Sequence, residues 1–353
     1  MVRHPSTIAV PHSRYLTSSP AVVGCVTGAL MAVFLWLGAC EEGAQIESAR
    51  EILALASKHD AKLTPLVAPS GLNWAAVRLG DRLFHDPILS RDGTVSCASC
   101  HDLKHGGDDG LVVSVGIDNR LGELNAPTVL NASLNSSQFW DGRAPTLSAQ
   151  IDGPIHNPNE MDSDWGQIVE RLNADASYRV AFETAYGAPL DAKLVRQAIV
   201  AFEESLITID APIDRWLLGD RQAMPIKALE GLHLFEQHGC ISCHQGRAFG
   251  GNLFQRLGVM REYFEAAQTF RRIDLGRFNH TQDSHDKHVF RVPSLRNAEL
   301  TGPYFHDGSA ATLPDAVRVM LRIQVGVEPD EAEVDRLVEF LRSLTGVLKG
   351  RSA

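Results

Sequence analysis

Two short stretches of the sequence place two thiols and an imidazole at one repeated spacing. The first holds Cys97, Cys100 and His101, and the second holds Cys240, Cys243 and His244. On one helical turn, residues three and four apart share a face. Two thiols so placed can bond the two vinyl groups of one porphyrin, and the adjacent imidazole can bind its iron. The spacing therefore predicts two covalently bound haem c groups.

A zinc site or a structural disulfide is the alternative use of such cysteines. Both are disfavoured because a histidine follows the second cysteine directly in each copy and no further cysteine pair could complete a zinc site. The two other cysteines, Cys25 and Cys40, lie in or at the end of an N-terminal apolar segment. No thiol remains for a disulfide or for thiol catalysis.

Residues 1–39 begin with basic side chains and continue into an apolar run, as in a secretory signal peptide. The run ends in Leu-Gly-Ala before Cys40, which resembles a bacterial lipoprotein cleavage box and would make Cys40 the lipid-bearing first residue of the mature chain. An uncleaved membrane anchor stays open, because about 18 or more apolar residues can span a bilayer. Both interpretations predict a periplasmic protein held at a membrane.

The whole chain has 353 residues, 44% of them hydrophobic and 22% charged, which is enough for two domains. Its net charge is −10. Without Arg3 and Arg14 of the signal segment, 31 basic residues stand against 43 acidic ones, a net charge near −12. This balance argues against nucleic acid as a partner and is compatible with a small cationic electron donor.

A weak internal duplication precedes the two cysteine motifs. Residues 79–84 and 230–235 both contain the pattern G-x-x-L-F, so we expect two domains of one kind whose Leu and Phe side chains pack at the haem edge. Apolar spacing predicts helices at 44–58, 164–186, 191–207, 226–235 and 331–344.

Two long segments show no regular period. Residues 102–150 are rich in Gly, Asn, Asp and Ser, and residues 250–287 are polar and irregular. No strand series is visible. The predicted fold class is all-α, with two cytochrome c-like haem domains at 44–210 and 211–346 and extensive loops.

Several longer motifs carry a family resemblance. They are Leu-Phe-His-Asp-Pro-Ile-Leu-Ser at 83–90, Phe-Trp-Asp-Gly-Arg at 139–143, Gly-Pro at 153–154 with Glu-Met at 160–161, Phe-Arg-Val-Pro-Ser-Leu-Arg-Asn at 290–297 and Pro-Tyr-Phe-His-Asp-Gly at 303–308. Together with both cysteine motifs, they resemble the bacterial di-haem cytochrome c peroxidases, a family that includes the MauG-type protein-oxidising enzymes. The resemblance covers about residues 75–346.

The resemblance implies a peroxidase that reduces hydrogen peroxide to water at the first haem. Electrons would enter singly at the second haem from a small cytochrome c or a cupredoxin. His101 and His244 would be the proximal ligands, and Met320 matches the second ligand of the electron-receiving haem, whose potential a thioether raises. MauG-type enzymes have tyrosine there, so Met320 favours the peroxidase branch. Without the resemblance, Met320 would be interpreted as a core residue.

One position departs from the family pattern. Many of its peroxidases have a histidine that closes the first haem until the second is reduced, and here that position is Ile117, which cannot bind iron. His105 lies nearby but sits in a loop typical of surface residues. We therefore expect a first haem that is open from the start, as in a MauG-like enzyme that oxidises Trp or Tyr of a partner protein.

The resemblance also implies roles around the peroxide. Glu160 matches the catalytic acid of the family, and Gln150 matches its hydrogen-bonding neighbour. Such a group is needed because a base must move a proton between the two peroxide oxygens. Trp140 matches an indole between the haems. Taken alone, Glu160 could be a solvated loop carboxylate or a helix cap, and Trp140 a packing residue. Arg143 could pair with a haem propionate or with a nearby carboxylate.

Finally, the resemblance implies a calcium ion between the domains, with Asn125, Thr301 and Pro303 as oxygen ligands. His306 matches a residue that could bond a propionate of the second haem, and the family tends to form homodimers. A non-enzymatic carrier of electrons with two haems stays open as a further alternative.

Overall fold

The computed structural model describes residues 63–264 and 271–348, all within one unit of the chain that begins at Ile52. The predicted signal segment at 1–39 and the predicted helix at 44–58 lie outside these residues. In the described part of the chain, no helix is both long and apolar enough to cross a membrane.

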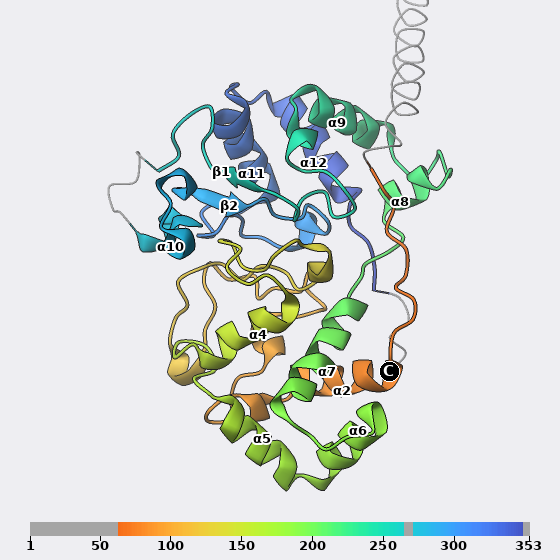
Figure 1. Cartoon of the computed structure of the whole chain (residues 1–353). Helices are drawn as coiled ribbons and strands as arrows, with labels where there is room; N and C mark the ends of the chain where they lie inside the picture. Colours follow the sequence, from red (N-terminus) through yellow and green to blue (C-terminus); the bar gives the residue numbers. More distant parts are fainter. Residues whose placement is uncertain (1–62, 265–270, 349–353) are drawn as a thin grey trace, which may run out of the picture. The chain divides into compact units, whose positions relative to one another are not determined.

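The fold is built mainly from helices joined by long loops, as expected (Figure 1). The helices of the first half are α2 (Trp74–His85), α3 (Cys97–Cys100), α4 (Leu147–His156), α5 (Trp165–Ala174), α6 (Ala176–Tyr186) and α7 (Ala192–Ser205). Those of the second half are α8 (Pro212–Leu217), α9 (Ile226–Gln237), α10 (Phe278–Thr281), α11 (Leu313–Met320) and α12 (Glu331–Arg342). The predicted helical stretch at 164–186 is two helices, α5 and α6.

One small sheet interrupts the helical pattern. The strands β1 (Phe254–Arg256) and β2 (Val289–Arg291) pair antiparallel, with Gln255 opposite Phe290. These strands were not predicted, because three residues are too few to show an alternating pattern.

Polar residues begin the main helices. The side chains of Asn73, Asp191 and Asp330 accept hydrogen bonds from the first free backbone amides of α2, α7 and α12, respectively. Such caps satisfy donors that have no partner within the helix. They fix where each helix starts, and therefore which of its faces meets the core.

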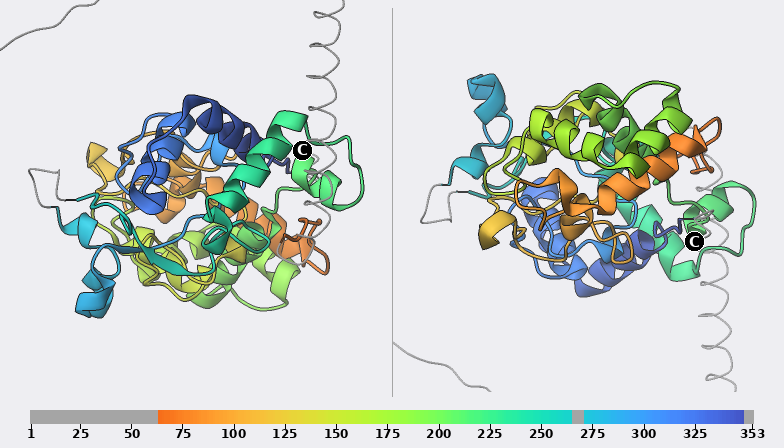
Figure 2. Two further views of the ribbon diagram at one scale, coloured as in Figure 1. Left: turned by 90° about the horizontal axis from the view of Figure 1, so that it is seen from above. Right: turned by 90° about the horizontal axis from the view of Figure 1, so that it is seen from below.

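Each half contains one closely packed helix pair, α2 with α7 and α9 with α12 (Figures 1 and 2). A Cβ added at Gly80 of α2 would lie 1.9 Å from the backbone oxygen of Ala198, and one added at Gly231 of α9 would lie 2.0 Å from that of Arg336. Only glycine allows the backbones to approach so closely. The glycine of the repeated G-x-x-L-F pattern thus has the same packing role in both halves.

The phenylalanine of that pattern also has one role in both halves. Phe84 packs on Phe202 of α7 with ring centroids 5.1 Å apart, and Phe235 packs on Phe340 of α12 with centroids 5.0 Å apart. All four rings are buried. The sequence duplication therefore corresponds to a repeated structural unit.

The two halves meet through buried polar contacts. The Asn131 amide donates to the Thr208 hydroxyl at 2.9 Å, and this hydroxyl donates to Asn297 Oδ1 at 3.2 Å. Val347, near the end of the described chain, forms a β-bridge with Ile209. Residues far apart in sequence thus fix the junction between the halves.

Candidate active site

The first cysteine motif forms one short helical turn, as its spacing predicted. Cys97–Cys100 make up α3, and Ser96 and Ser99 form a capping box at its start. The thiols of Cys97 and Cys100 are not joined in a disulfide. Burial raises the pKa of Cys97 to about 12 and that of Cys100 to about 11. The turn therefore holds two free, neutral thiols.

Both motif histidines are held in the same way. Nδ1 of His101 lies 3.2 Å from the carbonyl oxygen of Gly107, and Nδ1 of His244 lies 3.3 Å from that of Phe249. Because a carbonyl only accepts, Nδ1 carries the proton in each ring, and the Nε2 lone pair is left for a metal. Burial lowers the pKa of both rings, that of His244 to about 4. Neutral imidazoles of this kind are suited to bind iron.

The second motif opens into a cavity of about 420 Å³ with mostly apolar walls. Cys240, Cys243 and His244 line it, and so does Met320 at the end of α11. A π-helical turn (Leu321–Val325) directly follows Met320, and such turns are frequent at functional sites. The volume and the donors, two thiols, an imidazole and a thioether, fit a haem.

The first motif faces a much smaller cavity of about 60 Å³. Its lining includes Cys97, Cys100 and His101 together with the two predicted proton-transfer residues, Gln150 and Glu160. This volume is below the usual range for bound cofactors, so the fit to a haem rests here on the donor set: two free thiols and a neutral imidazole.

Glu160 is placed for acid–base chemistry. It lies in the turn that follows α4, and the Asn157 amide donates to its Oε1 at 2.6 Å. Burial raises the pKa of Glu160, against the Asn157 hydrogen bond and the charge of Arg143, which lower it. The carboxyl group can therefore exchange a proton more readily at mild pH than an exposed glutamate does.

Ile117 lies next to the backbone of Glu160 but does not line the first cavity. Its side chain is fully buried, and its backbone amide donates to the Glu160 carbonyl oxygen at 2.8 Å. His105, the other candidate ligand, has a side chain that is 79% exposed and pairs with Asp102 at 2.6 Å. The structure therefore places His105 at the surface and a hydrocarbon side chain near the first site.

A group of ion pairs that the sequence did not predict ties two loops together at this site. Arg91 lies 2.6 Å from Asp118 and 2.5 Å from Asp162. Arg120 lies 3.1 Å from Asp118 and donates to the carbonyl oxygen of Pro158 at 2.8 Å. The loop that contains Ile117 is thereby fastened to the turn that contains Glu160.

One short loop lies along the second cavity and carries a charge that acts on Glu160. Trp140 lines the second cavity, and its indole N–H donates to the backbone oxygen of Asn125 at 2.9 Å. Arg143, three residues later, pairs with Asp141 at 3.0 Å and lies 3.6 Å from the centroid of the Phe139 ring. Because the charge of Arg143 also acts on Glu160, this loop connects the two sites.

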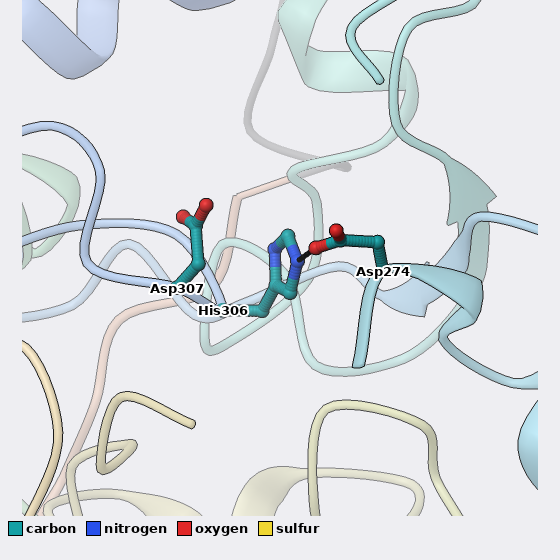
Figure 3. A group of neighbouring side chains, drawn as sticks. All are labelled: Asp274, His306 and Asp307. Atoms are coloured by element: carbon teal, nitrogen blue, oxygen red, sulfur yellow. Dashed lines mark hydrogen bonds and ion pairs between the residues drawn. The ribbon is translucent and has the colours of Figure 1, made fainter. Parts of the chain in front are cut away.

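His306 lies in a buried charged cluster at the second cavity (Figure 3). Its Nε2 is 2.9 Å from Asp274 Oδ1, and Asp307 is close by. The three side chains could hold a metal ion, but Arg271 lies 2.8 Å from Asp274 and 2.7 Å from Asp307. Because this guanidinium already pairs with both carboxylates, the cluster is an ion-pair network.

The three predicted calcium ligands all line the second cavity. The Asn125 amide nitrogen donates to Leu111 at 2.8 Å, which leaves its Oδ1 as a ligand atom. Within the described residues, no hydrogen bond uses this Oδ1 or the backbone oxygens of Thr301 and Pro303. Unused oxygens of this kind are the ligands that a hard cation such as calcium takes.

Glu203 is a buried acid that the sequence did not single out. It lies on α7, is 5% exposed, and its Oε2 has no hydrogen-bond partner within the described residues. Burial, with the charge of Glu204, raises its pKa to about 8, and its charge acts on Cys97. A glutamate on a helix is usually solvated, so no sequence signal pointed to this one.

Two sites with paired thiols and a neutral imidazole, in a mainly helical fold, define a class of haem-binding redox proteins. The family model described as di-haem cytochrome c peroxidase matches residues 74–222. The cytochrome c551 peroxidase of Nitrosomonas europaea is 44% identical over 286 residues, which cover 80% of this chain and 84% of that protein. The chain therefore belongs to the di-haem cytochrome c peroxidase family.

The MauG branch of the family is also similar. The methylamine utilization protein MauG of Methylorubrum extorquens is 38% identical over 240 residues, which cover 67% of this chain and 66% of that protein. The solved structure of a MauG-like protein associated with microbial copper homeostasis has a TM-score of 0.70 at 28% identity, and the match covers 80% of this chain and 93% of that one.

Proposed function

We propose that this protein is a peroxidase that reduces hydrogen peroxide to water with electrons from a small cytochrome c or a cupredoxin. Family membership and the relatives named cytochrome c peroxidases support this activity. The observation that counts most is that Glu160 and Gln150 line the same cavity as Cys97, Cys100 and His101. A proton-transfer group thus lies where peroxide would meet a haem.

Two covalently bound haem c groups belong to this proposal, one in each cytochrome c-like domain at 44–210 and 211–346. The repeated unit supports it, because both halves combine a close-contact glycine, a buried phenylalanine and a histidine with a bonded Nδ1. The Phe84 ring centroid lies 6.5 Å from that of His101, and the Phe235 centroid lies 6.3 Å from that of His244.

The proton path follows from the position of Glu160. A haem at the first site would supply an open metal position and the electrons for cleavage of the O–O bond. Glu160 takes the proton from the inner peroxide oxygen and returns it to the outer one, which leaves as water. Gln150 donates a hydrogen bond that orients the peroxide. With two electrons and two further protons, each peroxide yields two waters.

The second site receives the electrons in this proposal. His244 and Met320 would hold its haem iron, and His306 could bond a propionate. Trp140 would relay electrons toward the first site, since its loop lines the second cavity and carries Arg143, whose charge acts on Glu160. A calcium ion held by Asn125, Thr301 and Pro303 would keep this loop in place, because Asn125 accepts the indole hydrogen bond.

The same proposal includes export to the periplasm, with Cys40 as a lipid-bearing first residue, and a homodimer as the working form. Its support is the N-terminal signal pattern and the family resemblance. Mass spectrometry of the mature protein tests the first point, since a lipoprotein would begin at Cys40 and carry acyl chains.

The activity test uses the mature protein isolated from the periplasm with both haems bound. Reduced small cytochrome c is mixed with peroxide, and its oxidation is followed with and without the enzyme. We expect two haem additions by mass and two cytochromes oxidised per peroxide. A protein with fewer than two haems, or with no cytochrome oxidation, would contradict the proposal.

A MauG-like oxidation of Trp or Tyr in a partner protein is the second candidate. The buried Ile117 favours it, because no histidine at that position can close the first site. Turnover of peroxide only when a candidate partner protein is present, with no oxidation of cytochrome c, would establish it in place of the first. A purely electron-carrying protein would show six-coordinate, low-spin iron at both sites.

A further inference from the structure

Residues 106–110 cross residues 300–304 where the two halves of the protein meet. A Cβ added at Gly106 would lie 2.6 Å from the backbone oxygen of Leu300, and one added at Gly110 would lie 4.0 Å from that of Gly302. Asp108 lies between these two contacts. It is therefore held against the segment that contains Thr301 and Pro303.

Asp108 has a buried carboxylate group that is not fully hydrogen-bonded within the described residues. It is 2% exposed, and its Oδ1 has no hydrogen-bond partner in the described part of the chain. The neighbouring Asp109 also has one buried oxygen, Oδ2, without a partner. Neither carboxylate forms an ion pair with the residues that the structure describes. A buried carboxylate next to a second, half-buried one is costly unless a cation balances the charge.

Hydrogen bonds connect this acidic pair to the predicted cation ligands. Asp109 Oδ1 accepts from the backbone amide of Leu111 at 3.0 Å, and the backbone oxygen of Leu111 accepts from the Asn125 amide at 2.8 Å. Asp109 is thus connected to the Asn125 side chain through Leu111, and Asp108 precedes it in the segment that crosses residues 300–304.

These three oxygens are neutral, whereas calcium sites gain affinity with the number of negatively charged groups around them. We propose that Asp108 and Asp109 face the divalent cation at this junction and supply the negative charge that its neutral ligands lack. The inference rests on the proposed calcium site and adds the two residues that set its affinity. It also gives the buried Asp108 a counterion that no side chain in the described part of the chain supplies.

The cation would act on the electron path through Asn125. The backbone oxygen of Asn125 accepts from the Trp140 indole at 2.9 Å, and its backbone amide donates to the His306 carbonyl oxygen at 2.9 Å. Asp108 and Asp109 are therefore positioning residues, which influence the second cavity only through the cation and Asn125.

The test measures calcium binding to the protein with both haems in place, after the metal has been removed with EGTA. Calcium chloride is titrated calorimetrically into the wild-type protein and into the variants Asp108→Asn, Asp109→Asn and Glu170→Gln. Glu170 is an exposed acid on α5, so its variant makes the same charge change away from the junction. We expect calcium affinity to fall roughly 10- to 100-fold in each Asn variant, as for other residues that support metal ligands, and to be unchanged in the control.

Thermal unfolding in EGTA and in calcium gives a second readout. Without calcium, Asp108→Asn should unfold at the same temperature as the wild type or above it, because the repulsion between the two carboxylates is gone. With calcium, the stabilisation by the metal should be smaller than in the wild type. A merely structural carboxylate would lower both unfolding temperatures alike. Should Asp108→Asn not fold, the half-buried Asp109 provides the same test.

The outcomes separate the two levels of the proposal. A wild-type protein that binds no calcium would overturn the calcium site itself. A wild-type protein that binds calcium, with Asn variants that bind equally well, would overturn only the role of Asp108 and Asp109.

Discussion

At the scale of single residues, the chemistry depends on the protonation of Glu160. Because general acid–base groups contribute about 10²- to 10⁴-fold to rate, we expect Glu160→Gln to lower the rate of peroxide reduction by that factor. Both haems should still be present, since Glu160 contributes no bond to them. Stopped-flow measurement of the reaction with peroxide, together with the haem content, checks this.

The pH profile provides a sharper form of the same prediction. Burial raises the pKa of Glu160 above its ordinary value of 4.5, and the residue takes up a proton from peroxide only when it is ionised. The rate should therefore fall as the pH is lowered through a pKa above 4.5. Glu160→Gln should lack this acid limb, whereas the exposed-site variant Glu170→Gln should keep it. If Glu160→Gln showed the same fall in rate at low pH as the wild type, another group would be responsible for it.

The residue at position 117 determines which spin state we expect for the iron of the first site in the oxidised protein. Isoleucine has no atom that can bind iron, so with a haem at the first site we expect the oxidised protein to show a high-spin ferric signal. Ile117→His introduces an imidazole there and should increase the low-spin fraction and slow the reaction with peroxide until the protein is reduced. Electron paramagnetic resonance of the oxidised protein measures both states, and Ile117→Leu is the matched control, expected to stay high-spin.

The sequence was sufficient for some of these residues and not for others. The cysteine motifs were visible because their spacing is the one that covalent attachment of a porphyrin requires. Glu160 and Met320 were found only by resemblance, since a lone acid or methionine has no distinctive pattern. Asp108 and Arg91 were missed because burial and ion pairing depend on segments distant in the sequence.

At the scale of elements, the repeated helix pairs depend on two glycines. Gly80→Ala or Gly231→Ala would place a methyl group about 2 Å from a backbone oxygen of the partner helix, where nothing can move aside cheaply. Such overpacking costs about 1–3 kcal/mol or more, which exceeds the gain of about 1 kcal/mol in helix propensity. We therefore expect both variants to be destabilised, as measured by urea unfolding.

Gly122→Ala is the control for this prediction. A Cβ at Gly122 would meet no atom closer than 3.5 Å, and its backbone φ is one that alanine adopts. Its unfolding midpoint should stay close to that of the wild type. Equal stability of Gly80→Ala and Gly122→Ala would show that α2 and α7 can separate without cost.

Element boundaries were predicted less well than element types. The helical spacing at 164–186 indicated one stretch, but Asp175 ends α5 and caps α6 with its own carboxylate. The strands β1 and β2 form because residues 253–257 and 288–292 meet across the second half. Such pairing leaves no local trace in a three-residue segment.

At the scale of the whole molecule, a buried ion pair connects distant parts of the described chain. Arg296 lies 2.8 Å from Asp214, and both side chains are 1% exposed. Asp214 also accepts the backbone amide of Leu66 at 3.0 Å, and Arg296 donates to the carbonyl oxygen of Arg247 at 3.0 Å. The pair thus joins the beginning of the described chain to its second half.

Removing one partner of this pair should lower the free energy of unfolding far more than removing both. Arg296→Met leaves the Asp214 charge buried without a partner, so we expect a loss of about 3–5 kcal/mol in the free energy of unfolding. The double variant Asp214→Leu with Arg296→Met removes both charges and should recover most of this loss, apart from the hydrogen bond to Leu66.

Urea unfolding of the wild type, both single variants and the double variant measures the coupling, with Lys227→Met as the control. Lys227 and Asp335 pair at 2.6 Å with side chains 44% and 59% exposed, so this control should hardly change the midpoint. If the double variant were as unstable as the sum of the single ones, the two charges would act independently, and the pair would not be what holds Leu66 to the second half.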